Sequence, residues 1–161
     1  MILGIDPGLE NTGWGVIETR NEKPEIRLVD CGVILTSKKD RSEVRLEKIF
    51  EEIQKIIKKY KVEEVAMESL FFAKNIRSAM SVAEAIGVVK VAAQNLGKTI
   101  FEYTPLQVKI ALVGYGRAEK EQVEVMVRES LNLEKVISPG HASDAVAVAL
   151  THSFTSSFVR E

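Results

Sequence analysis

The chain has 161 residues, of which 45% are hydrophobic and 28% charged, with a formal net charge of -1. This length predicts one domain, residues 1–161, with a sizeable core. The apolar runs are too short to cross a membrane, and the single Cys31 excludes an internal disulfide. With a start that reads as a strand rather than a signal peptide, the chain is expected to be cytoplasmic.

The first part of the chain predicts three strands joined by short links. Residues 1–6 form an apolar run that ends in Asp6, and Pro-Gly and Thr-Gly pairs punctuate the turn that follows. Strands are expected over 13–20 and 25–35, with residues 21–24 as a hairpin loop. Three early strands with such short connections indicate an antiparallel meander.

The remainder alternates helices and strands, as apolar spacing and capping residues indicate. Ser42 is the expected N-cap of the first helix, and Thr104 followed by Pro105 marks the start of a short one. The predicted elements are a helix from Ser42 to Tyr60, a strand over 62–68, a helix over 76–96 ending at Gly97, a strand over 99–103, a helix after Pro105, and helices over 118–132 and 141–154.

This order predicts an α/β fold with a mixed sheet. A helix between the third and fourth strands implies a right-handed crossover to a parallel neighbour. If the first and fourth strands are neighbours, Asp6 and Glu68 meet at their carboxyl ends, where open α/β sheets form their sites.

Aspartate is rare here, with four against nineteen glutamates, so its positions are informative. Asp6 ends an apolar strand, and Asp144 lies in an Ala/Val-rich helical segment three residues after His141. Buried carboxylates need partners, and Asp6, Glu68, His141 and Asp144 together predict a site for two Mg²⁺ or Mn²⁺ ions. Each residue alone also has a structural interpretation, such as a turn cap, a strand-end charge or a helix N-terminus.

Residues 70–120 carry seven basic against three acidic side chains, which favours contact with a polyanion if these bases share a face. The segment after Glu68 combines aromatic, basic and small polar groups, as nucleic-acid sites do. The alternatives are that the rings fill the core and the helical lysines are solvated. The candidate DNA-binding residues are Phe71, Phe72, Lys74, Asn75, Arg77, Ser78, Lys109 and Lys120.

One motif misleads. Gly8 and Gly13 have the glycine spacing of a phosphate loop, but Trp14-Gly15 follows where Lys and Ser or Thr belong. We therefore do not interpret this turn as a nucleotide site, although its amides could still contact a phosphate near Asp6.

Several blocks, in this order, resemble the bacterial RuvC Holliday-junction resolvases. The resemblance runs nearly end to end. Its blocks are Ile5-Asp6-Pro7-Gly8 with Thr12-Gly13, Glu68 with Phe71-x-Ala73-Lys74-Asn75, Tyr103-Thr-Pro-x-Gln107-Val108-Lys109, Gly116-x-Ala118-x-Lys120-x-Gln122-Val123 and Ala142-x-Asp144-Ala145.

The resemblance implies a ribonuclease-H-like fold with a five-stranded sheet of order 3-2-1-4-5 flanked by helices. It implies a homodimeric, Mg²⁺-dependent endonuclease that nicks two opposing strands of a four-way DNA junction and leaves 5′-phosphate and 3′-hydroxyl ends. Family acids map onto Asp6, Glu68 and Asp144, with position 141 completing the set. The junction-stacking aromatic maps onto Phe71 and the family lysines onto Lys109 and Lys120, while RuvA and RuvB are the implied partners.

One position departs from the pattern. Many members carry Asp where this chain has His141, as some others do. Because a neutral imidazole ligates Mn²⁺ better than Mg²⁺, we predict a Mn²⁺ preference and a greater loss of activity in acid than an Asp version would show.

Three rival functions remain open from the sequence. Actin-like ATPases and sugar kinases share the Asp-x-Gly start, but normally have two lobes that 161 residues cannot hold. A non-catalytic junction-binding module would bind without cleaving. Other nucleases of this fold would prefer RNA–DNA hybrids or damaged DNA.

Overall fold

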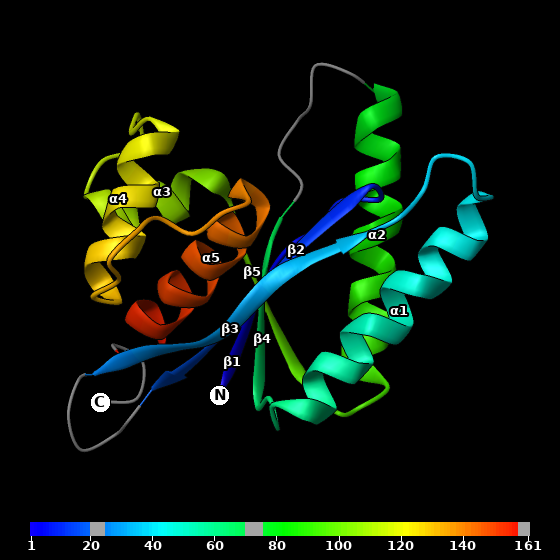
Figure 1. Ribbon diagram of the computed structural model, residues 1–161, viewed down its shortest axis with the longest axis horizontal. Coiled ribbons are helices and arrows are strands. Elements are labelled where there is room, and N and C mark those ends of the chain that lie inside the picture. The colour runs from blue at the N-terminus through cyan, green and yellow to red at the C-terminus, as the bar shows by residue number, and fades with distance from the viewer. Residues whose placement is uncertain (20–24, 70–75, 158–161) are drawn as a thin grey trace.

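The computed structural model describes residues 1–19, 25–69 and 76–157, with side chains over the same ranges except 76–78 and 157. These residues form a mixed sheet of five strands in the order β3-β2-β1-β4-β5 with helices on both faces (Figure 1). The elements are β1 (Ile2–Asp6), β2 (Asn11–Thr19), β3 (Ile26–Leu35), α1 (Ser42–Lys59), β4 (Glu64–Glu68), α2 (Ile76–Gln94), β5 (Thr99–Tyr103), α3 (Pro105–Val113), α4 (Lys120–Ser130) and α5 (Gly140–Ser157).

The strand pairing confirms the predicted fold class. β1, β2 and β3 pair antiparallel, which is the expected meander, and β4 and β5 join on the other side of β1 in parallel. Parallel pairing of β1 with β4 requires the crossover that α1 provides. The order 3-2-1-4-5 is therefore the one that the family resemblance implied.

Two helix starts show how local capping works in this chain. Thr104 caps α3 as predicted: its hydroxyl accepts from the Gln107 amide at 3.2 Å, and the Gln107 side chain accepts from the Thr104 amide at 2.8 Å. The prediction for Ser42 was wrong, because Ser42 is already the first helical residue and Arg41 occupies the cap without a side-chain bond. The hairpin loop predicted at 21–24 lies outside the described residues.

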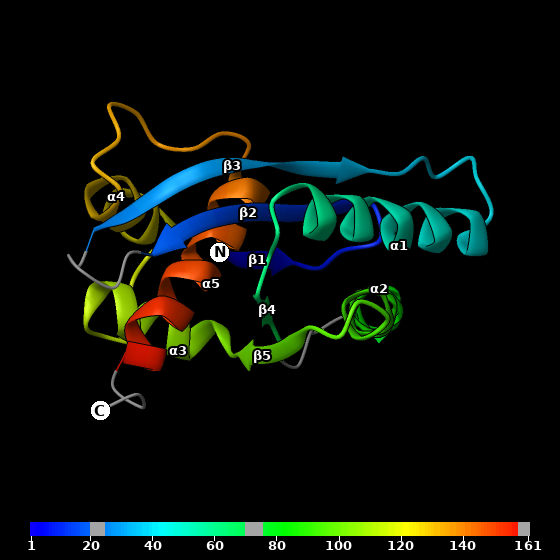
Figure 2. The ribbon, with the colours of Figure 1, turned by 90° about the horizontal axis from the view of Figure 1, so that it is seen from below.

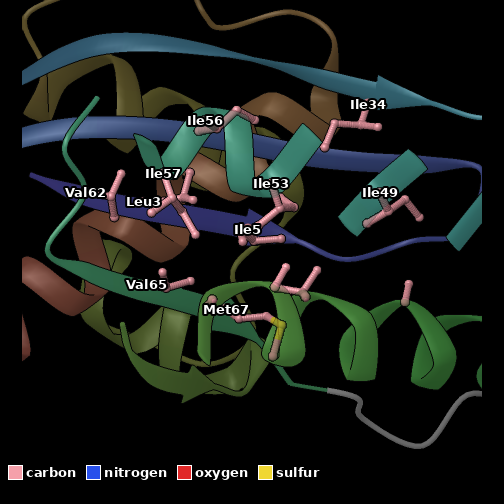
Figure 3. Close-up of a cluster of buried hydrophobic side chains, with 14 of the residues drawn as sticks. Leu3, Ile5, Ile34, Ile49, Ile53, Ile56, Ile57, Val62, Val65 and Met67 are labelled. Atoms are coloured by element: carbon pink, nitrogen blue, oxygen red, sulfur yellow. The ribbon is translucent and has the colours of Figure 1, made fainter. Parts of the chain in front are cut away.

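The sheet separates two apolar layers by the alternation of its side chains. Leu3 and Ile5 of β1, with Val65 and Met67 of β4, pack under α1 and α2 (Figure 3). The alternate residues, such as Ile2 and Ala66, face the layer that contains α5. α3 and α4 pack against α5, so that α5 lies centrally in that layer (Figures 1 and 2). No helix within the described ranges is long and apolar enough to cross a bilayer.

Three glycines allow α5 to lie directly on the sheet. Gly4 of β1 pairs with Gly15 of β2, and Gly13 lies two residues before Gly15 on the same face of β2. A Cβ at Gly4 would stand 2.0 Å from the carbonyl oxygen of Ala145, and one at Gly13 would stand 1.9 Å from that of His141. A side chain at either position would therefore displace the N-terminal half of α5.

Candidate metal centre

Two acids end neighbouring parallel strands. The β1–β4 register runs to Ile5 opposite Met67, and the next residue of each strand is Asp6 and Glu68. Their adjacent positions follow from the parallel pairing of β1 with β4, which the chain order left conditional and the structure shows. Both carboxylates consequently lie at the carboxyl edge of the sheet, where this class of fold forms its sites.

The N-terminal part of α5 brings the other two residues to the same edge. His141 and Asp144 are three residues apart on this helix and share a face. With Asp6 they form a cluster in which one ligand atom from each residue lies within 4.8 Å of the others. The close approach of α5 at Gly13 makes this convergence of strand and helix residues sterically feasible.

Two short contacts organise the cluster. His141 Nδ1 lies 2.7 Å from Asp6 Oδ2, and Lys120 Nζ donates to Asp144 Oδ2 at 2.7 Å. Among the four side chains in these two contacts, that of Asp6 is the most enclosed, at 15% exposure. Those of His141 and Lys120 are about half exposed, at 48% and 53%. The site is thus open to solvent on the side of α4 and the start of α5.

Burial, with neighbouring negative charge, raises the pKa of two of these carboxyl groups, Glu68 and Asp6. Burial raises the pKa of Glu68 to about 7, helped by the negative charges of Asp6 and Asp144 and by a hydrogen bond with Asp6, while Lys120 opposes the rise. The pKa of Asp6 is also raised, chiefly by burial, although its bond to His141 acts in the opposite direction. Burial lowers the pKa of Lys120, but the hydrogen bond and charge of Asp144 outweigh it, and the net shift is upward.

This electrostatic state fits a cation site. Carboxylates crowded at one edge in a half-buried setting repel each other, and a divalent ion would relieve that repulsion. The donors are carboxylate oxygens and one imidazole, a set that suits Mg²⁺ or Mn²⁺. Three of the four predicted residues, Asp6, His141 and Asp144, form a group that could hold a metal ion, and Glu68 adjoins it through a hydrogen bond with Asp6.

The predicted DNA-binding residues fall into four groups. Phe71, Phe72, Lys74 and Asn75 lie outside the described residues, and Arg77 and Ser78 begin α2 without described side chains. Lys109 is half-buried on α3. Lys120 is not simply solvated, because it is ion-paired with Asp144 beside the cluster.

Sequence reasoning missed two sets of residues on the elements that carry this site. The first is the stripe of Gly4, Gly13 and Gly15 beneath α5, for which glycines at alternating strand positions were an available signal. The second joins Tyr103, His152 and Glu64 behind the cluster, and no local pattern indicates it because the residues come from three separate elements.

A family model supports the resemblance independently of this geometry. The model described as crossover junction endodeoxyribonuclease RuvC matches residues 2–152. The chain belongs to the RuvC family. The RuvC protein of Clostridioides difficile is 46% identical over 153 residues, which are 95% of this chain and 89% of that protein. The RuvC protein of Fusobacterium nucleatum is also 46% identical, over 94% of this chain and 78% of its own length.

Solved structures agree with the RuvC assignment. The Thermus thermophilus RuvC structure superposes with a TM-score of 0.92 at 36% identity, covering 98% of this chain and 96% of that one. The same protein in complex with a Holliday junction substrate gives the same TM-score and covers 95% of that chain. The yeast mitochondrial resolvase Ydc2, at 9% identity and a TM-score of 0.71, shares the fold. The ribonuclease-H-like fold expected from the sequence is confirmed.

Proposed function

We propose that this chain resolves four-way DNA junctions by paired, divalent-metal-dependent hydrolysis of phosphodiester bonds, leaving 5′-phosphate and 3′-hydroxyl ends. The observation that carries the proposal is the convergence of Asp6, His141 and Asp144 within 4.8 Å in a member of the RuvC family. Residues 1–161 would act as one nuclease domain, because the two apolar layers lie on opposite faces of the same sheet. This domain would act in recombination and repair in the cytoplasm.

In this proposal the three clustered residues and the adjoining Glu68 hold the metal. Asp6, Glu68 and Asp144 offer carboxylate oxygens and His141 an imidazole nitrogen, and proton release from Glu68 frees its carboxylate for binding. Two Mg²⁺ or Mn²⁺ ions, when bound, supply Lewis-acid stabilisation of the phosphodiester and a more acidic water. Lys120 lies beside Asp144 and can offer its ammonium to the oxygens of the scissile phosphate, where negative charge develops.

Junction recognition is assigned to the candidate DNA-binding residues that the sequence predicted. Phe71 is proposed to stack on an unpaired base, with Phe72, Lys74, Asn75, Arg77 and Ser78 nearby in the chain. Lys109 and Lys120 would contact the phosphate backbone of the DNA. The structure of a RuvC relative with a Holliday junction supports a junction as the substrate.

A homodimer is proposed because one site cuts one strand and resolution needs two cuts. Support comes from an open apolar face of α2: Met80 and Val91 are 62% and 58% exposed and lie eleven residues apart on one side of the helix. Gly87 lies between them, and a Cβ there would meet nothing within 4 Å. Replacing Met80 and Val91 by Glu is expected to shift the mass measured by light scattering towards the monomer.

RuvA and RuvB are proposed as branch-migration partners from the family alone.

The test is cleavage of synthetic mobile and immobile-core four-way junctions with Mg²⁺, Mn²⁺ or Ca²⁺. Wild type is compared with Asp6→Asn and with Asp40→Asn, a matched change at an exposed residue before α1. We expect symmetric paired nicks for wild type and Asp40→Asn, and binding without nicks for Asp6→Asn.

The remaining outcomes identify the rivals. Tight junction binding without cleavage by wild type in any metal would indicate a non-catalytic module. Faster cleavage of an RNA–DNA hybrid than of a junction would indicate another nuclease of this fold, and nucleotide binding would favour the ATPase class.

A further inference from the structure

A buried histidine lies on α5, the helix that carries two residues of the candidate metal centre, and both of its ring nitrogens form hydrogen bonds. His152 of α5 is 1% exposed, with Nδ1 2.7 Å from the Tyr103 hydroxyl and Nε2 3.1 Å from Glu64 Oε2. The ring of Phe101 covers it at a centroid distance of 4.3 Å. One proton arrangement that satisfies both contacts has Tyr103 donating to Nδ1 and Nε2–H donating to the Glu64 carboxylate.

These contacts join the helix and the strand that carry the metal-site residues. Glu64 begins β4, the strand that ends in Glu68. Tyr103 is the in-register neighbour of Glu68 on β5, and its carbonyl accepts from the Ser69 amide at 2.9 Å. Through its backbone Tyr103 therefore holds the end of β4, and through its hydroxyl it holds α5.

The helix α5 connects these hydrogen bonds to the metal site. His152 follows His141 by eleven residues, which is about three turns or ~16 Å, and so lies on the same face of α5. Between them Ala145 and Ala149 rest on Gly4, a contact of small residues without directional bonds. These apolar contacts set how closely α5 approaches the sheet, whereas the hydrogen bonds at the two ends of this stretch, at His141 and at His152, are directional and constrain the rotation of the helix.

We propose that Tyr103 and His152 are positioning residues of the metal centre, which set the rotation of α5 and hence the spacing of His141 and Asp144 from Asp6. The inference rests on the proposed function, because it assumes that these residues bind a metal. The alternative is that the buried bonds contribute only to general stability.

The experiment measures Mn²⁺ binding to the metal-free protein without DNA, by calorimetry and by the electron paramagnetic resonance signal of free Mn²⁺. Tyr103→Phe removes only the hydroxyl and keeps the ring. Tyr60→Phe is the matched control, since Tyr60 is also half-buried and its hydroxyl donates to Asp30 in the α1 layer. His152→Gln, which keeps a side-chain N–H donor, serves as the conservative variant beside His152→Phe.

We expect Tyr103→Phe to weaken Mn²⁺ binding about three- to tenfold, less than the 10–100-fold seen for groups bonded directly to a ligand. Tyr60→Phe should leave Mn²⁺ affinity unchanged, and His152→Gln should retain more of it than His152→Phe. Equal affinity for wild type and Tyr103→Phe, with only a lower melting temperature, would overturn the inference, and so would equal weakening by Tyr60→Phe. If wild type binds no Mn²⁺, the proposed metal site itself is wrong and this inference falls with it.

Discussion

Lys120 and Asp144 form an ion pair that joins the first residue of α4 to the fifth residue of α5, with Nζ 2.7 Å from Oδ2. A Cβ on Gly140 would lie 3.1 Å from the same Nζ, so the lysine runs closely past the start of α5. Asp144 is also one of the three clustered metal-binding candidates. A cation supplied by the chain therefore lies directly beside the carboxylates proposed to hold the metal.

Replacing Lys120 by Met tests the role of that cation. Cleavage of a saturating junction is expected to fall about 10²- to 10³-fold, the loss typical when one stabilising group at a developing charge is removed. Mn²⁺ binding should be kept or strengthened, because the positive charge near Asp144 is gone. Lys55→Met is the control, an exposed lysine paired with Glu52 on α1. A cleavage rate equal to that of wild type would show that the ion pair of Lys120 is only structural.

Glu68 predicts how the metal-free fold responds to pH. Its pKa is raised from 4.5 to about 7, so the folded state binds this proton more tightly than the unfolded state does. The resulting stabilisation is complete below about pH 4.5 and is lost as pH rises through about 7, by at most about 3 kcal/mol. In EDTA, Glu68→Gln should melt above wild type at pH 8 and close to it at pH 4. Parallel melting curves for the two proteins across this range would contradict the shift.

The same shift predicts the pH dependence of metal binding. Glu68 must lose its proton to ligate, so Mn²⁺ affinity should rise between about pH 6 and 8 with proton release near neutrality. Calorimetry in two buffers of different ionisation enthalpy measures the released proton. Glu68→Gln should bind more weakly and release fewer protons, and an unchanged proton count would show that Glu68 is not the group involved.

Gly13 tests whether the close approach of α5 builds the site. A Cβ in Gly13→Ala would stand 1.9 Å from the His141 carbonyl oxygen, so the start of α5 must move away from the sheet. We expect a stability loss of about 1–3 kcal/mol and a larger fall in cleavage than in junction binding. Asp40→Asn, a change at an exposed residue before α1, is the control and should leave both stability and cleavage unchanged. Full activity in Gly13→Ala would exclude this packing as a requirement.

His141→Asp tests the metal preference. The imidazole contacts Asp6 at 2.7 Å and belongs to the cluster, so the change adds a negative charge and replaces a nitrogen ligand with oxygen. The ratio of the Mn²⁺ rate to the Mg²⁺ rate is expected to fall, and activity in acid to fall less than in wild type. Identical ratios in both proteins, measured on the same junction between about pH 5.5 and 8, would remove the argument for a Mn²⁺ preference.

The sequence by itself determined the order of elements and the four metal-site candidates, which depend on local signals: strand and helix periodicity, the Thr104 cap, and polar residues at the ends of apolar elements. The strand order 3-2-1-4-5 was implied only by the family resemblance, and the structure confirms it. Ser42 was misassigned by one residue because cap and first-turn positions share the same preferred residue types.

Only the tertiary structure decided which residues meet. Lys120 carries no local signal that separates it from a solvated lysine, and its pairing with Asp144 depends on how α4 packs on α5. The glycine contact beneath α5 and the Tyr103–His152–Glu64 cluster join elements far apart in the chain. Such contacts depend on the register and approach of packed elements, which side-chain volume and directional hydrogen bonds determine and periodicity does not.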